Sequence, residues 1–126
     1  MSKQTLSTDK APGAIGPYAQ GILAGSLIFT SGQLPIDMQT GLLETDDIKK
    51  AVRHALDNLR AILQAAGADR EHIVKTTVFL TDLADFAAAN EAYAAFFPDA
   101  PPARSCVQVA ALPKNARVEI EAIAIL

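Results

Sequence analysis

The chain has 126 residues, half of them hydrophobic and a fifth charged, which is typical of a globular protein. Its net charge of −3 and its longest cationic run, Lys49-Lys50, give no electrostatic reason to expect a nucleic-acid partner. No apolar run approaches the roughly 20 residues that cross a bilayer, and the polar first ten residues contain no signal-peptide core. With a single cysteine and therefore no internal disulfide, we expect a cytoplasmic protein with one domain over residues 1–126 and no membrane contact.

The first third of the chain predicts an arm, a hairpin and a loop. Residues 1–13 are polar and predict a loosely held arm with a short extended piece. Residues 22–31 predict two strands that turn at Ala24-Gly25-Ser26. Gly32 follows directly and would let a backbone or a ligand come close. Residues 34–44 contain proline, aspartate and glycine and predict a loop.

The middle of the chain predicts a long amphipathic helix. Thr45 is expected to be the N-cap, with Asp46 and Asp47 in the first turn, where the helix dipole favours anions. Gly67 is expected to end the helix. Apolar residues recur at spacings of three and four, at Ile48, Val52, Ala55, Leu59, Ile62 and Ala66.

A strand and a second helix follow. Residues 73–80 are rich in β-branched side chains and predict a strand. Residues 82–97 predict a helix, with Asp82 as its cap. Asn90 is unusual because it is an amide on an apolar stripe of this helix. It either bonds a nearby loop as a core amide or contacts a ligand.

The next strand, over residues 103–109, carries the residue on which the functional argument depends. Pro101-Pro102 ends the preceding helix, and the alternation that follows places Arg104 and Cys106 on one face. A guanidinium cannot lose its charge and presents donors shaped for a carboxylate. Away from bulk water it therefore needs an anion, supplied either by the protein or by a ligand. Cys106 has no obvious histidine partner, and we expect an inert thiol.

The last strand, residues 118–126, offers candidate anions. Glu119 and Glu121 share one of its faces. If the preceding turn closes a tight hairpin, one of them lies near Arg104 and Cys106 and pairs with the arginine. A slip of one residue would exchange the two faces of the strand, so the position of the glutamates depends on the register.

The order β–β–α–β–α–β–β predicts an α+β sheet with two helices packed on one face. The strands over 73–80 and 118–126 are apolar on both faces. Because two helices cover only one side of the sheet, we predict a symmetric homo-oligomer. The sequence contains no zinc spacing, Walker loop or dinucleotide fingerprint, so no metal and no cofactor are expected.

Five segments together resemble the Rid/YjgF family, from about residue 8 to the end of the chain. They are IGPYAQG at 15–21, TSGQLP at 30–35, DLADFAAANEAYAAFF at 82–97, PPARSCVQV at 101–109 and VEIEAIA at 118–124. The resemblance implies a chorismate mutase-like subunit with a mixed sheet, assembled as a homotrimer with three clefts between subunits. It also implies hydrolysis of enamines and imines, such as 2-aminoacrylate, 2-iminopropanoate and 2-iminobutanoate, to 2-oxo acids and ammonia.

The same resemblance implies roles for individual residues. Arg104 would bind the substrate carboxylate, and Glu119 would position or activate the attacking water. The remaining pocket residues would be Tyr18, Ser31, Gly32, Asn90 and the backbone at Cys106. Such imines already hydrolyse in water, so acid–base help of about 10²–10⁴-fold would suffice without a cofactor.

Other functions remain open at this point. The same arginine could serve a protein that binds small carboxylates without turnover, and the oligomer could act as a chaperone-like holdase. Some relatives are associated with ribonuclease activity, against which the acidic balance argues. A chorismate mutase would be expected to need more arginines in its strands than this chain offers.

Overall fold

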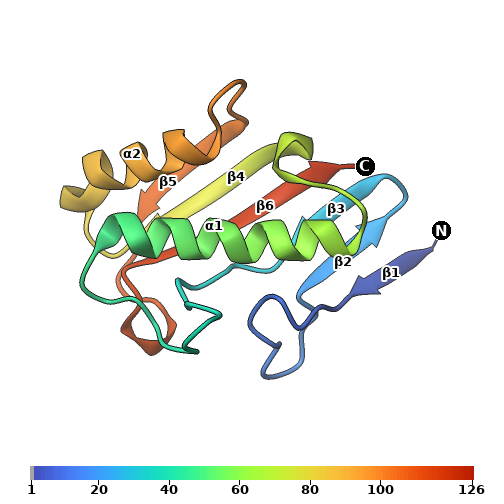
Figure 1. Cartoon of the computed structure of the whole chain (residues 1–126), viewed down its shortest axis with the longest axis horizontal. Helices are drawn as coiled ribbons and strands as arrows, with labels where there is room; N and C mark the ends of the chain where they lie inside the picture. Colours follow the sequence, from blue (N-terminus) through green and yellow to red (C-terminus); the bar gives the residue numbers. More distant parts are fainter. Residues whose placement is uncertain (1) are drawn as a thin grey trace.

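The computed structural model describes residues 2–126 as one mixed sheet with two helices on one face (Figure 1). The strands are β1 (Lys3–Leu6), β2 (Gly21–Ala24), β3 (Leu27–Thr30), β4 (Ile73–Leu80), β5 (Ala103–Gln108) and β6 (Val118–Ile125). The helices are α1 (Ile48–Ala65) and α2 (Phe86–Phe96), with 3₁₀ turns at Arg70–His72, Leu83–Asp85 and Pro113–Asn115. The predicted element order and the placement of both helices are confirmed.

The strand order differs from the predicted hairpin at the end of the chain. The sheet runs β1-β2-β3-β6-β4-β5, and β6 is antiparallel to both β3 and β4. Strand β5 pairs in parallel with β4 at the sheet edge, so β4 separates β5 from β6. The expected β5–β6 hairpin is therefore wrong. The reason is α2, because a helical crossover returns the chain parallel to the strand that it left.

The N-cap of helix α1 lies two residues later than expected. The Asp47 carboxylate accepts the N–H groups of Lys49 and Lys50 at 2.9 and 3.3 Å, so the N-cap is Asp47 and not Thr45. The Glu44 carboxylate accepts the N–H groups of Asp46 and Asp47, which holds these residues in a turn outside the helix. The helix ends where expected, beside Gly67 at φ +84°.

The hydrophobic core lies between α1, α2 and one face of the sheet. Leu56, Leu59 and Ile62 of α1 are fully buried, as are Ile28 of β3 and Ile120 of β6. Alternate residues of β4 and β6 are buried, as expected for strands that are covered on one side. Neither helix is long and apolar enough to span a bilayer in the part of the chain that the structure describes.

The other face of the sheet is open in the single chain. Leu27, Phe29, Val107 and Ile125 lie on this open face, each between 40 and 46% exposed. Exposed apolar side chains gathered on one face are typical of an interface between subunits. The homo-oligomer stays a prediction, and the exposed apolar side chains on the open face of the sheet support it.

The loop over residues 34–44 is confirmed, and a buried amide of α1 attaches it to the helix. Asn58 is only 2% exposed, and its Nδ2 donates to the carbonyls of Leu34 and Ile36 at 3.2 and 3.0 Å. A buried amide that satisfies two loop carbonyls fixes the position of the loop relative to the helix.

Candidate functional site

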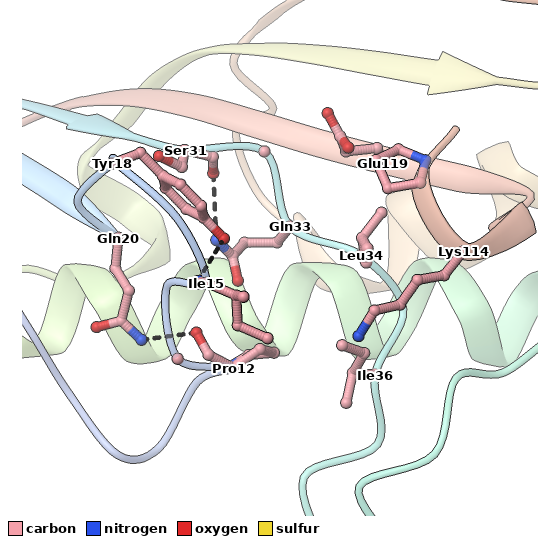
Figure 2. A pocket seen from close by; sticks show the side chains of 13 residues that line it. Pro12, Ile15, Tyr18, Gln20, Ser31, Gln33, Leu34, Ile36, Lys114 and Glu119 are labelled. Atoms are coloured by element: carbon pink, nitrogen blue, oxygen red, sulfur yellow. Dashed lines mark hydrogen bonds between the residues drawn. The ribbon is translucent and has the colours of Figure 1, made fainter. Parts of the chain in front are cut away.

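Four of the predicted site residues line one cavity, of about 530 Å³, which we call the Glu119 cavity. They are Tyr18, Ser31, Gly32 and Glu119. Figure 2 shows Tyr18 and Glu119 on opposite sides of this cavity, with Leu34 and Ile36 on the same side as Glu119. The walls thus come from the arm, the segment after β3, and β6.

The arm is held in place by Gln20, which is 4% exposed. Its Oε1 accepts the N–H of Thr8 at 2.7 Å, and its Nε2 donates to the carbonyl of Thr8 at 3.0 Å. The same Nε2 also donates to the carbonyl of Pro12 at 2.8 Å (Figure 2). Pro12 and the nearby Ile15 therefore become one wall of the cavity. Tyr18 closes the turn, because its hydroxyl accepts the N–H of Ile15 at 3.4 Å.

Gly32 lies directly against Glu119. Gln33 exchanges two backbone hydrogen bonds with Ile120, at 2.8 and 3.1 Å, and this bridge brings the Gly32 segment beside β6. A Cβ at Gly32 would lie 2.7 Å from Cδ of Glu119, so only glycine fits without moving the carboxylate. A group does lie close to Gly32, but it is the Glu119 side chain and not the backbone or ligand that was expected.

The Glu119 carboxylate is half-buried, and two effects change its acidity. Burial raises its pKa above the usual value, and the neighbouring charge of Glu121 raises it further. A carboxyl group with a raised pKa both accepts and returns a proton more readily near neutral pH. The Ser31 hydroxyl donates to the carbonyl of Ala19 at 2.6 Å, so towards the cavity it acts as an acceptor.

Sequence reasoning missed the other residues that line this cavity, and Gln20 and Lys114 are the two with long polar side chains that matter most here. Gln20 follows no apolar pattern that would predict its burial, and Lys114 lies in a turn with no motif. Lys114 and Asn115 both adopt φ 59°, an uncommon conformation for residues other than glycine. The Lys114 side chain extends across the cavity toward Ile36 (Figure 2).

Arg104 and Asn90 lie together, away from the Glu119 cavity. The Arg104 Nη1 donates to Oδ1 of Asn90 at 2.7 Å, and both residues line a cleft of about 440 Å³, which we call the Arg104 cleft. Its guanidinium carbon lies 4.9 Å from the Tyr93 ring centroid and 5.5 Å from that of Phe86. Asn90 thus bonds the arginine, and its interpretation as an amide that bonds a loop is wrong.

Arg104 has no anionic partner among residues 2–126. No carboxylate of these residues lies within 4.0 Å of its guanidinium. Of the two alternatives for its anion, the one in which the protein supplies Glu119 or Glu121 is therefore wrong for the single chain. Asn90 takes one donor of the guanidinium and leaves the remaining N–H groups without a charged acceptor.

Cys106 lies two residues farther along the same face of β5. The thiol is half-buried against the hydrophobic core, and burial raises its pKa, while the positive charge of Arg104 partly opposes this increase. A thiol with a raised pKa is a weak nucleophile near neutral pH. This agrees with the expected inert cysteine.

Strand register places Arg104 and Glu119 on opposite faces of the sheet. Arg104 pairs with Thr76 of β4, which is fully buried under the helices. Glu119 pairs with Phe79 of β4, and side chains three residues apart on one strand point to opposite faces. The prediction that the glutamate lies near Arg104 across a ladder is thus wrong, and one chain holds two separate groups of site residues.

No group of three or more histidine, cysteine or acidic side chains among the described residues could hold a metal ion. The expectation of chemistry without a metal or cofactor stays a prediction.

Comparison with known proteins places the chain in a family. The family model described as Endoribonuclease L-PSP matches residues 8–126. A relative from Salmonella typhimurium, named 2-iminobutanoate/2-iminopropanoate deaminase, is 52% identical over 128 residues, covering 99% of this chain and 98% of that protein.

Two solved structures are similar over nearly their whole length. The Escherichia coli TdcF structure with bound serine has a TM-score of 0.93 and 51% identity, covering 98% of each chain. The Rid family protein YyfA from Yersinia pestis has a TM-score of 0.95 and 45% identity, covering 99% of this chain and 100% of that one. The chain therefore belongs to the Rid/YjgF family, whose model carries the description Endoribonuclease L-PSP.

Proposed function

We propose that this protein is an enzyme that hydrolyses 2-imino acids, including 2-iminopropanoate, its tautomer 2-aminoacrylate, and 2-iminobutanoate, to 2-oxo acids and ammonia. The observation that carries the proposal is Arg104, a guanidinium fixed by Asn90 and without a carboxylate partner within residues 2–126. The name of the Salmonella typhimurium relative, at 52% identity, supports the same reaction class.

Arg104 binds the substrate carboxylate in this proposal. Its unpaired N–H groups form a planar fork that accepts a carboxylate in two parallel hydrogen bonds. Asn90 and the two aromatic rings hold the guanidinium before the substrate arrives. The carboxylate of a 2-imino acid is bonded directly to the C=N carbon, so fixing it also fixes the direction of attack. The family resemblance also implies that the backbone at Cys106 lines the substrate pocket, although Cys106 does not line the Arg104 cleft of the single chain.

Glu119 acts on the water. Its carboxylate takes a proton as the water oxygen bonds to the imine carbon, which gives a tetrahedral carbinolamine. It returns this proton to the nitrogen, which completes the neutral carbinolamine. Glu119 then takes the proton of the new hydroxyl group and passes it to the same nitrogen, the C–N bond breaks with its electron pair on nitrogen, and ammonia leaves as the C=O bond of the 2-oxo acid forms. The raised pKa of Glu119 suits this exchange of one proton in both directions. Tyr18, Ser31 and Gly32 shape the space around the reacting carbon.

A complete site requires two chains. Because Arg104 and Glu119 lie on opposite faces of one sheet, we propose that the Arg104 cleft of one subunit meets the Glu119 cavity of its neighbour. The apolar open face supports such an assembly, and the family resemblance implies a homotrimer with three equivalent clefts.

The first experiment measures ammonia and 2-oxo acid released from 2-aminoacrylate that is generated enzymatically in the assay. We expect the native chain to accelerate release and Arg104→Ala to abolish the acceleration. Arg70→Ala is a matched control, because Arg70 also lies against an aromatic ring, that of Phe96 at 5.7 Å, but lines neither cavity. Binding of a carboxylate without any gain in rate would reject the enzyme in favour of a binding protein.

The second experiment tests the shared site by mixing subunits. Arg104→Ala and Glu119→Gln are each expected to be inactive. In randomly mixed trimers about a quarter of the clefts combine a native Arg104 with a native Glu119, so activity should return to roughly that fraction. If both residues of a cleft came from the same chain, no mixture would recover activity.

A further inference from the structure

Tyr93 of α2 lies against Arg104 because of a hydrogen bond to the strand beside it. Thr76 is the ladder neighbour of Arg104 and is fully buried. Its hydroxyl shares a 2.6 Å hydrogen bond with the hydroxyl of Tyr93, which is 7% exposed. The bond therefore fixes the Tyr93 ring beside the strand position from which the arginine projects, and its centroid lies 4.9 Å from the guanidinium carbon.

The ring of Tyr93 is the part that faces the arginine. Its hydroxyl is used by Thr76 inside the core, and burial raises its pKa, so it supplies no proton to the cleft. Phe97 packs against the same ring, with centroids 4.9 Å apart and planes inclined at 47°. The ring is thus held both at its hydroxyl and on its surface, and a fixed aromatic ring attracts a cation in one preferred place.

We propose that Tyr93, anchored by Thr76, is a positioning residue that sets the orientation of the Arg104 guanidinium before the substrate binds. The inference rests on the proposed function, because it takes Arg104 as the carboxylate-binding group. An arginine loses much rotamer freedom when it is fixed. Fixing it during folding removes this cost from the binding step, so Tyr93 acts on affinity and not on the chemical step.

The experiment compares Tyr93→Phe, Tyr93→Leu and Thr76→Val with the native protein. We measure kcat and KM for 2-iminobutanoate, and the affinity for its product 2-oxobutanoate by calorimetry. Tyr93→Leu removes the ring and should raise KM and weaken 2-oxobutanoate binding about tenfold, with kcat within about twofold. Tyr93→Phe and Thr76→Val remove only the anchor and should each weaken binding about threefold. Their double variant should be no weaker than either alone, because both remove one hydrogen bond.

Phe96→Leu is the matched control for loss of a buried aromatic ring. Phe96 is 8% exposed on the same helix, but the cation beside it is Arg70. We expect Phe96→Leu to lower the melting temperature about as much as Tyr93→Leu and to leave 2-oxobutanoate binding unchanged. The proposal is overturned if Tyr93→Leu binds with native affinity, or if Phe96→Leu weakens binding equally.

Failure of the proposed function would look different. A native protein that binds 2-oxobutanoate in a Tyr93-dependent way but hydrolyses no imine would refute the enzyme and support the positioning role. A native protein that binds no small carboxylate would overturn the positioning role as well.

Discussion

Replacing Gly32 by alanine tests the position of Glu119 without altering its chemistry. The added Cβ would lie 2.7 Å from Cδ and 2.9 Å from Cγ of Glu119, whereas carbon atoms pack at about 3.5–4.0 Å. The carboxylate must therefore move by about 1 Å. A displacement of this size at a reacting group can cost about 10²-fold in rate. We expect kcat to fall by that order with KM nearly unchanged, because Arg104, the residue that we propose binds the substrate carboxylate, lies elsewhere.

Stability should change little in this variant. Gly32 does not adopt a positive φ, so alanine fits the backbone, and the half-buried Glu119 side chain can rotate into the cavity. We expect the free energy of unfolding to stay within about 1 kcal/mol of the native value. Gly13→Ala is the control, because Gly13 lines the same cavity but an added Cβ there would meet nothing within 4 Å.

The assay is release of ammonia and 2-oxo acid under saturating and limiting imine, with thermal melts of each variant. The double variant Gly32→Ala with Glu119→Gln should be no slower than Glu119→Gln alone, because both changes affect one group. The reasoning is refuted if Gly32→Ala turns over at the native rate or if Gly13→Ala is equally slow. It is also refuted if the fold-reduction in kcat of the double variant equals the product of the fold-reductions of the two single variants.

Three further predictions follow from single contacts. Glu121→Gln removes the charge that helps raise the Glu119 pKa, so the acidic limb of the kcat/KM profile should move to lower pH; a move to higher pH would contradict this. Asp69 has a pKa of about 2, lowered first by its hydrogen bonds from Arg60, so it stabilises the fold above pH 4 and loses this effect as pH falls toward 2. Asp69→Asn should therefore cost about 1 kcal/mol at pH 7 in denaturant titrations, allowing for solvent screening, and less at pH 3. Asn58→Ala leaves the Ile36 carbonyl without its donor, removes one of the two donors to the Leu34 carbonyl, and should cost about 1–3 kcal/mol; an unchanged melting temperature would contradict it.

The elements of this fold can be read from local patterns, but the order of its strands cannot. The spacing of apolar residues predicted α1, and alternation placed Arg104 and Cys106 on one face, as the structure confirms. The partner of β5 depends on a contact between segments nearly thirty residues apart, such as the pairing of Thr76 with Arg104. The helix between β4 and β5 was the available signal, because such crossovers join parallel strands.

The candidate site shows the same division. Asn90 could be singled out because an amide on an apolar stripe is unusual, yet its bond to Arg104 required the packing of α2 on β5. Tyr93 fitted the apolar stripe and gave no sign that its ring lies against a cation. The role of Gln20 could not be predicted for another reason. Its side chain bonds backbone atoms, and every residue has these atoms, so no residue type in the sequence marks the partners.

That glutamine has a consequence for how such a pocket can change. Pro12, Gly13 and Ile15 form one wall of the Glu119 cavity but lie outside the hydrophobic core, with Ile15 80% exposed. Because Gln20 forms its hydrogen bonds with main-chain atoms, substitutions of the side chains in this wall leave those bonds in place and require no repacking of the core. Substrate preference can thus be varied at these three positions separately from the stability of the scaffold, which makes them the natural place to redesign selectivity.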